Sequence, residues 1–154
     1  MVLLQRLQKV YGVRGLMGGR SSKNKGDNYE RELAAYINEA TSIQSFRAPL
    51  SGGGHVGLSG GADLMGTPHL FVEAKRVERL NFHAAMHQAE TNKVKTNSPE
   101  HPIVMTRRNR MKTGESLCVL RLDDFLEMYK VYLEYKGENK IGHPKEEMST
   151  MQET

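Results

Sequence analysis

The alternation of apolar and polar positions between residues 61 and 76 predicts two short strands joined by a tight Gly-Thr-Pro turn. Asp63 lies on the first strand. Because successive side chains of a strand point to opposite faces, Glu73 and Lys75 share one face of the second strand with Phe71. Its other face, which we expect to pack on a core, carries Leu70, Val72 and Ala74. Two carboxylates and an amine are therefore expected on one hairpin.

Apolar residues recur at helical spacing in three further segments, so three helices are expected. The first begins with Asp27 or Asn28 as its N-cap and ends near Ala40. The others cover residues 78–95 and 122–135, and the last has Phe125, Leu126, Met128, Tyr129, Tyr132 and Leu133 spaced for burial. Additional short strands are expected at residues 45–49, 102–106 and 116–121. The order predicts an α/β fold with a mixed sheet flanked by helices.

Two local patterns suggest common sites but lack the residues that those sites need. The glycine-rich stretch 51–61 is expected to be a mobile loop, and it lacks the Gly-Lys-Ser/Thr ending of a nucleotide-binding P-loop. His83 and His87 are four residues apart on the second helix, but Ala84 stands where a zinc protease has glutamate. We therefore interpret the two histidines as solvent- or DNA-facing. The glycine stretch is either a loop that closes on nucleic acid or a plain linker.

Positive charge is concentrated in two places, although the chain as a whole carries only +4. Residues 1–25 contain six basic side chains and no acid, and residues 26–154 sum to −2. We interpret residues 1–25 as a flexible basic arm, residues 26–135 as the folded domain and residues 136–154 as a disordered tail. A second basic cluster consists of Arg107, Arg108, Arg110 and Lys112. Two separate basic patches favour a nucleic acid as the partner.

Cysteine content and hydropathy indicate the cellular setting. Cys118 is the only cysteine, and its apolar neighbours predict a small core residue rather than a reactive thiol. An unpaired cysteine is typical of a reducing compartment, and no apolar run approaches the roughly 20 residues of a membrane span. A soluble, cytoplasmic protein is expected.

The predicted hairpin suits a divalent metal bound by oxygen ligands, with Lys75 near enough to contact a phosphate or an attacking water. Asp63 and Glu73 would usually be joined by another carboxylate or a backbone oxygen. The first helix offers Glu30 and Glu32, and helical periodicity alone does not choose between them. The plain alternative is that Glu73 and Lys75 form only a salt bridge on an exposed strand.

Four motifs occur in a fixed order: Gly26-Asp-Asn-Tyr-Glu-Arg-Glu-Leu33, Arg47-Ala-Pro-Leu-Ser-Gly52, Gly61-Ala-Asp-Leu64 and Val72-Glu-Ala-Lys75. Together they resemble the PD-(D/E)XK nuclease superfamily, most closely its archaeal-type Holliday junction resolvases, including phage versions. The resemblance covers about residues 25 to 125. It implies a restriction-endonuclease-like fold and a metal-dependent endodeoxyribonuclease that cuts four-way junctions.

The resemblance also implies roles for individual residues. Glu30, Asp63, Glu73 and Lys75 would form the catalytic set, and Mg²⁺, or Mn²⁺ in its place, would be held by Glu30, Asp63, Glu73 and the Ala74 carbonyl. The residues implied to contact DNA are Arg31, Arg47 and Ser51, and the basic residues Arg107, Arg108 and Arg110 would add to them. Gln88 would lie near the site.

A resolvase that cuts two strands symmetrically implies a homodimer bound to branched DNA. Two alternatives remain open: another nuclease of the same superfamily, nicking or restriction-like, or a DNA-binding module that does not cleave.

Overall fold

A computed structural model describes the backbone of residues 14–49 and 61–138, and the side chains of residues 21–49 and 61–138. The elements, in chain order, are α2 (Arg14–Thr41), β1 (Phe46–Arg47), β2 (Leu64–Met65), β3 (Leu70–Arg76), α3 (Phe82–Lys95), β4 (His101–Arg107), η1 (Thr113–Glu115), β5 (Leu117–Val119) and α4 (Leu122–Lys136). The expected order of helices and strands is confirmed, with one added 3₁₀ turn. The chain divides into two compact units on either side of the Leu120–Arg121 bond.

The strands of the first unit form a three-stranded mixed sheet in the order β3-β4-β5, and a two-stranded antiparallel pair of β1 and β2. β3 and β4 are parallel, with α3 as the crossover between them, and β5 is antiparallel to β4. A backbone hydrogen bond of 2.8 Å from Asp63 N–H to the Val72 carbonyl links the β2 region to β3. The mixed α/β architecture expected from the sequence is therefore present in its coarse form.

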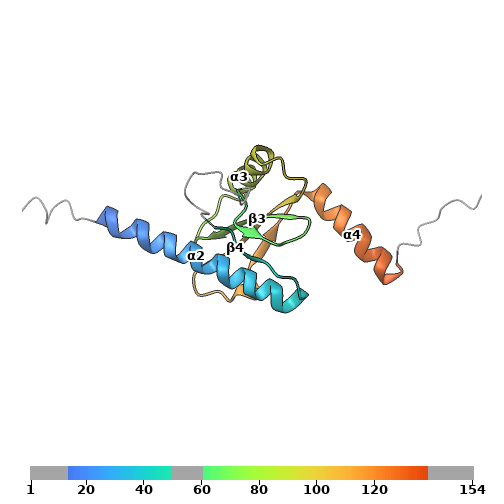
Figure 1. Cartoon of the computed structure of the whole chain (residues 1–154), viewed down its shortest axis with the longest axis horizontal. Helices are drawn as coiled ribbons and strands as arrows, with labels where there is room; N and C mark the ends of the chain where they lie inside the picture. Colours follow the sequence, from blue (N-terminus) through green and yellow to red (C-terminus); the bar gives the residue numbers. More distant parts are fainter. Residues whose placement is uncertain (1–13, 50–60, 139–154) are drawn as a thin grey trace, which may run out of the picture. The chain divides into compact units, whose positions relative to one another are not determined.

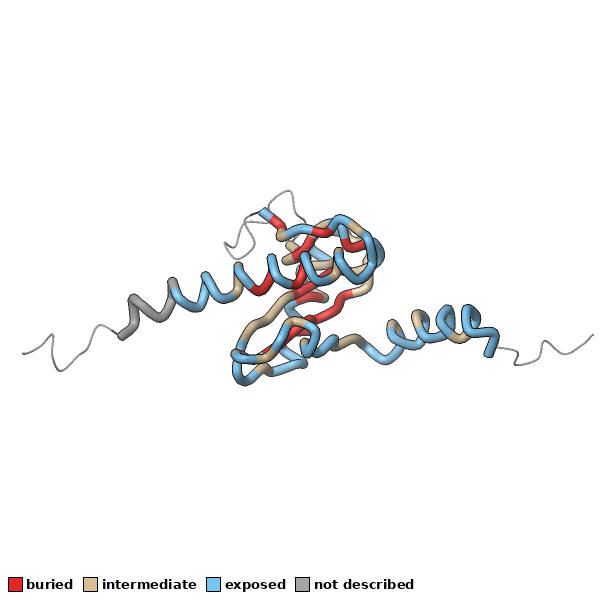
Figure 2. Tube along the Cα trace, turned by 90° about the horizontal axis from the view of Figure 1, so that it is seen from below, coloured by how far each residue is buried: buried red, intermediate tan, exposed pale blue. Residues whose placement is uncertain are grey.

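The three-stranded sheet lies between α2 and α3 (Figure 1). On one face, Val72, Ile103 and Met105 pack with Tyr29 and Leu33 of α2. On the other face, Val104 packs with the α3 residues Ala85, Met86 and Ala89. Figure 2 shows the buried positions concentrated along the strands and in the part of α2 that crosses them. The predicted core face of β3 is confirmed, because Leu70 and Ala74 pack against the same cluster as Val72.

Two helix starts differ from the sequence prediction. α2 begins at Arg14, so it includes residues 14–25 of the segment 1–25 that we interpreted as a flexible basic arm. Asp27 and Asn28 do not cap it, because they lie inside the helix, where their side chains accept hydrogen bonds from Arg47 and Arg31. α3 starts at Phe82, four residues later than expected, since the Asn81 side chain accepts a hydrogen bond from Ala84 N–H and acts as the N-cap.

The predicted strands 45–49 and 116–121 are shorter in the structure. In the second strand, Cys118 is less buried than the sequence predicts. Cys118 lies exposed on β5, not in the core, and its neighbour Leu117 is 55% exposed. β5 is an edge strand with β4 as its partner, so its side chains are covered less than those of a central strand. The residues around Cys118 form a continuous apolar run, which does not indicate which face of the strand is covered.

The second unit contains α4, which has the expected bounds within one residue. Asp123 and Asp124 lie in its first turn, where negative side chains interact favourably with the helix dipole, and Gly137 ends it with a φ of +70°. The expectation that its apolar residues are buried is wrong for the described chain, since none of the α4 side chains is buried. Within the described ranges, no helix combines the length and the hydropathy that a bilayer crossing requires.

The turn between β2 and β3 depends on Gly66. Its φ is +73°, and a Cβ at this position would lie 2.5 Å from the carbonyl oxygen of Gln44. We expect Gly66→Ala to lower the free energy of unfolding by about 2–4 kcal/mol, because both the backbone conformation and the close approach exclude a side chain.

Gly26→Ala is the matched control for this change. Gly26 lies inside α2, and a Cβ added there would have no neighbouring atom within 4 Å, so alanine should stabilise the helix by about 0.5–1 kcal/mol. Urea denaturation of the two variants measures both effects. Equal stability of the two proteins would contradict the geometry of the turn.

Candidate active site

The backbone of Asp63 is hydrogen-bonded between the segment that follows β1 and strand β3. Its main chain donates to the Val72 carbonyl and accepts a hydrogen bond of 2.8 Å from Ala48 N–H. Its side-chain Oδ2 accepts a hydrogen bond of 2.7 Å from Ala74 N–H on β3. The carboxylate is therefore held against the middle of β3. The predicted hairpin is wrong in its pairing, because Asp63 lies just before β2 and β2 pairs with β1, not with β3.

Glu73 and Lys75 lie on the same face of β3, and the Lys75 ammonium is 2.6 Å from Oε1 of Glu73. Glu73 is only 2% exposed, although Lys75 reaches partly into solvent. The second carboxylate oxygen of Glu73, Oε2, is buried and has no hydrogen-bond partner among the residues that the structure describes. The pair is thus not an ordinary exposed salt bridge, because one buried anionic oxygen is left unsatisfied.

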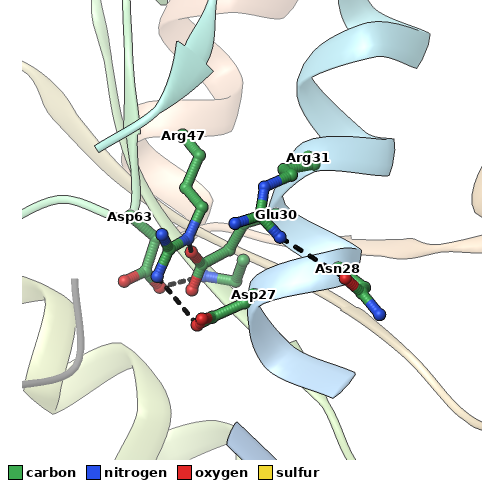
Figure 3. Close-up of polar contacts among 7 residues, drawn as sticks. Asp27, Asn28, Glu30, Arg31, Arg47 and Asp63 are labelled. Carbon is green, nitrogen blue, oxygen red and sulfur yellow. Dashed lines mark hydrogen bonds and ion pairs between the residues drawn. The ribbon is translucent and has the colours of Figure 1, made fainter. Parts of the chain in front are cut away.

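The structure distinguishes the two candidate acids of α2. Glu30 is 7% exposed and lies on the Asp63 side of the helix, where its Oε2 accepts a hydrogen bond of 2.6 Å from Arg47 Nε (Figure 3). Glu32 points elsewhere and pairs with Arg107. Glu30 is therefore the helix acid that belongs to this site, which helical periodicity had left open.

Asp27 joins the same cluster, which sequence reasoning missed. Its Oδ1 is 2.8 Å from Nη2 of Arg47, so this arginine bridges Asp27 and Glu30 (Figure 3). The spacing of three residues, which places both acids on one face of a helix, is the signal that could have indicated it. The sequence alone suggested for Asp27 only the role of an N-cap.

The acids of the site perturb one another. Burial and, to a smaller extent, the charge of Glu73 raise the pKa of Asp63 to about 7. The hydrogen bond from Ala74 N–H and the charge of Lys75 act in the opposite direction and lower this pKa. Burial also raises the pKa of Glu73, and the ion pair with Lys75 opposes that shift. The charge of Glu30 raises both pKa values. The structure thus brings Glu30, Asp63, Glu73 and Lys75 into electrostatic contact and makes a bound cation favourable.

These residues fit a hard divalent metal in part. A bound cation would interact with the unsatisfied Oε2 of Glu73 and would lower the raised pKa of Asp63. Across residues 21–49 and 61–138, no group of three or more His, Cys, Asp or Glu side chains forms a ligand set by itself. Mg²⁺ is commonly bound by one or two carboxylates with water and substrate phosphate, so two acids and a backbone oxygen are sufficient donors.

The residues implied to contact DNA lie in different environments. Arg31, Arg108 and Arg110 are exposed, whereas Arg47 is half-buried in its pairs with Asp27 and Glu30. Gln88 is exposed on α3, as are His83 and His87. Ser51 and most of the glycine stretch lie outside the described residues.

Arg107 departs from the expected DNA-contacting role. It is 7% exposed, donates from Nη1 to the Met111 carbonyl at 2.7 Å and pairs through Nη2 with Glu32. Its guanidinium lies over the Tyr29 ring, 5.1 Å from the centroid. Arg107 therefore ties α2 to the end of β4, and the basic run in the sequence did not distinguish it from its exposed neighbours.

We expect Arg107→Ala to lower the free energy of unfolding by about 2–3 kcal/mol, because it removes the hydrogen bond, the ion pair and the ring contact together. Arg108→Ala, one position away and exposed, should change stability by less than about 0.5 kcal/mol. Thermal and urea unfolding of both variants test this difference. Similar losses in the two proteins would show that the contacts of Arg107 do not stabilise the fold.

Comparison of this chain with protein-family models, with curated protein sequences and with solved structures finds no match. Its function is therefore inferred from the geometry described above and from the motifs in the sequence.

Proposed function

We propose that this chain is a metal-dependent DNA endonuclease of the PD-(D/E)XK type, with a restriction-endonuclease-like fold and branched DNA as its substrate. The observation that supports the proposal most strongly is the convergence of Glu30, Asp63, Glu73 and Lys75 from α2, the β2 region and β3. These residues are separated by up to forty-five positions in the sequence. Burying an acid with an unsatisfied oxygen, as in Glu73, lowers the stability of the fold. Proteins retain such features mainly at functional sites.

In this mechanism Asp63 and Glu73 would hold Mg²⁺ with the Ala74 carbonyl, and Glu30 would help to position its water ligands. The metal, when bound, polarises the scissile phosphate and lowers the pKa of a coordinated water. The Lys75 ammonium would orient the attacking water or offset the charge that develops on the phosphorane. Arg47 holds Glu30 in place, which makes it a positioning residue as well as a candidate phosphate contact.

The proposed substrate follows from the charge of the chain and from the motif resemblance. Arg31, Arg108 and Arg110 are exposed cations available to a phosphate backbone. A resolvase cuts two of the four strands of a junction at symmetric positions. A homodimer with two-fold symmetry can make these paired cuts, one with each subunit.

Incubation of the protein and Mg²⁺ with an end-labelled four-way junction and a duplex of the same sequence tests this function. Paired nicks in the junction alone support the resolvase proposal. Equal cutting of both substrates would contradict it but would leave a nuclease of broader or sequence-dependent specificity. Absence of any metal-dependent product would contradict the nuclease proposal itself.

A DNA-binding module without cleavage is the second candidate. It is favoured by one observation, that Glu30 and Glu73 already have cationic partners in Arg47 and Lys75. Asp63→Ala separates the two candidates, because a binding module would lose nothing by it. A nuclease would keep its affinity for DNA and stop cutting.

A further inference from the structure

A cavity of about 410 Å³ opens in the first unit at the C-terminal ends of β3 and β4. Its volume falls in the range of roughly 300–1,000 Å³ that is typical of small-molecule sites. The walls come from the β3–α3 connection, the first turn of α3, the end of β4 and β5. None of the four proposed catalytic residues lines this cavity, so it is a separate site from the carboxylate cluster.

The walls of the cavity are largely apolar, and several are open to solvent. The apolar lining consists of Val77, Leu80, Phe82, Met111 and Leu117. Phe82 is 42% exposed and Leu117 is 55% exposed, so a flat ligand can reach the aromatic ring from solvent. An accessible aromatic ring in an apolar recess is the arrangement on which proteins stack unpaired bases.

The polar part of the lining is mainly cationic. Arg79 and Arg108 line the cavity and are exposed, and within residues 21–49 and 61–138 neither side chain has an ion-pair or hydrogen-bond partner. Arg107 contributes to the wall, and its buried Nε has no hydrogen-bond acceptor in the described part of the chain. The one acid of the lining, Glu78, accepts a hydrogen bond of 2.8 Å from Asn109 N–H. An apolar recess with free arginines fits a flat ring attached to an anionic group, as in a nucleotide.

The cavity is adjacent to the carboxylate cluster across one strand. Thr106 lines it and is paired with Lys75 in the parallel ladder of β3 and β4. Paired residues of neighbouring strands point to the same face, and the strands are about 4.8 Å apart. A DNA strand with a phosphate at Lys75 would therefore pass the mouth of the cavity with a neighbouring nucleotide.

We propose that this cavity binds an unpaired nucleobase of the DNA strand that contacts Lys75. Phe82 stacks on the base, and Arg79 and Arg108 contact the phosphates on either side of it. The proposal rests on the proposed function, because it takes DNA as the substrate. It adds that the enzyme selects branched DNA through a base that is unpaired near the branch point.

The test is a double-mutant cycle between protein and DNA. The full-length protein and Phe82→Leu are titrated, in EDTA, with a junction that carries one unpaired adenine at the branch and with the same junction carrying an abasic site there. The unaltered protein should bind the abasic junction about tenfold more weakly, and Phe82→Leu should show less than about a twofold difference. Leucine keeps an apolar side chain in the cavity, and a thermal melt verifies that the variant is folded.

Arg108→Gln and Arg110→Gln form a matched pair of charge controls. Both arginines are exposed on the same loop, but only Arg108 lines the cavity. Arg108→Gln should weaken binding to both junctions, because an abasic site retains the phosphates that Arg108 contacts. Arg110→Gln, which lies outside the cavity, should weaken binding to both junctions by less than Arg108→Gln does. Equal effects of the two variants, or equal binding of the two junctions by the unaltered protein, would overturn the assignment.

The outcome is distinguishable from failure of the proposed function. If the protein prefers the unpaired adenine but gives no product with Mg²⁺, the base-binding site stands and the nuclease proposal fails. If it cuts junctions with Mg²⁺ but binds the abasic junction as tightly as the junction with the unpaired adenine, the nuclease proposal stands and the base-binding site is refuted.

Discussion

Replacing Asp63 by asparagine is expected to abolish DNA cleavage and to make the metal-free protein more stable. The carboxylate is largely buried beside Glu73, and its pKa is raised to about 7, so its ionised form is unfavourable at neutral pH. Asparagine removes that charge, and its amide oxygen can still accept the hydrogen bond from Ala74 N–H. We expect a gain of about 1–3 kcal/mol in the free energy of unfolding at pH 7.

Cleavage by Asp63→Asn should fall by about 10³-fold or more, because the metal contributes several kcal/mol to the transition state and its ligand is lost. Urea denaturation in EDTA and a junction cleavage assay measure the two effects. Asp123→Asn, on the exposed first turn of α4, is the control and should lower stability by only a few tenths of a kcal/mol without altering cleavage. A destabilised Asp63→Asn protein that still cuts DNA would contradict both the buried charge and the metal-binding role of this residue.

The same pKa shift gives a pH dependence with a definite sign. Between the ordinary carboxyl pKa near 4 and the raised value of about 7, the folded protein binds a proton at Asp63 that the unfolded chain has lost. The contribution of Asp63 to stability is therefore present at low pH and declines as the pH rises through this window. In metal-free buffer, Asp63→Asn should remove that decline.

Replacing Lys75 by methionine should have the opposite effect on stability while also abolishing cleavage. The ammonium forms an ion pair with Glu73, whose other oxygen is already buried without a hydrogen bond. Loss of the lysine leaves a buried carboxylate with less compensation, and we expect a loss of about 1–3 kcal/mol, moderated by the partial exposure of Lys75.

Combining Glu73→Gln with Lys75→Met should restore most of that stability, because the double variant no longer buries an unpaired charge. Cleavage should remain absent in the single and double variants. Chemical denaturation of the four proteins, in EDTA at pH 7, gives the coupling energy. Additive effects of the two substitutions would show that Glu73 and Lys75 do not form a buried pair.

How far the sequence predicts this structure depends on whether local spacing is sufficient. The period of two in β3 separated Val72, which packs under α2, from Glu73 and Lys75, which share the opposite face. A continuous apolar run predicted β4, and helical spacing predicted the helices that complete the order of the elements. These features depend on residues that are close in sequence, and the spacing of such residues determines which face of a strand or helix they share.

The features that local spacing missed depend on contacts between distant segments. Arg107 is buried because Tyr29 and Glu32 of α2 meet it, and no property of the basic cluster indicates that. The start of α2 differs from the prediction because Asp27 lies inside the helix, and its side chain accepts a hydrogen bond from Arg47, a residue twenty positions away, instead of capping a helix end. Helical spacing could not choose between Glu30 and Glu32, whereas the tertiary structure places only Glu30 beside Asp63.

A crystal structure of the protein soaked in Mn²⁺, with anomalous diffraction to locate the metal, would show directly whether the carboxylate cluster is a metal site. We expect an anomalous peak between the carboxylates of Asp63 and Glu73, at about 2.0–2.3 Å from an oxygen of each, and no peak at that position in Asp63→Asn crystals. A metal bound elsewhere, or carboxylates that retain their present partners at saturating Mn²⁺, would refute the metal site and the hydrolytic mechanism with it.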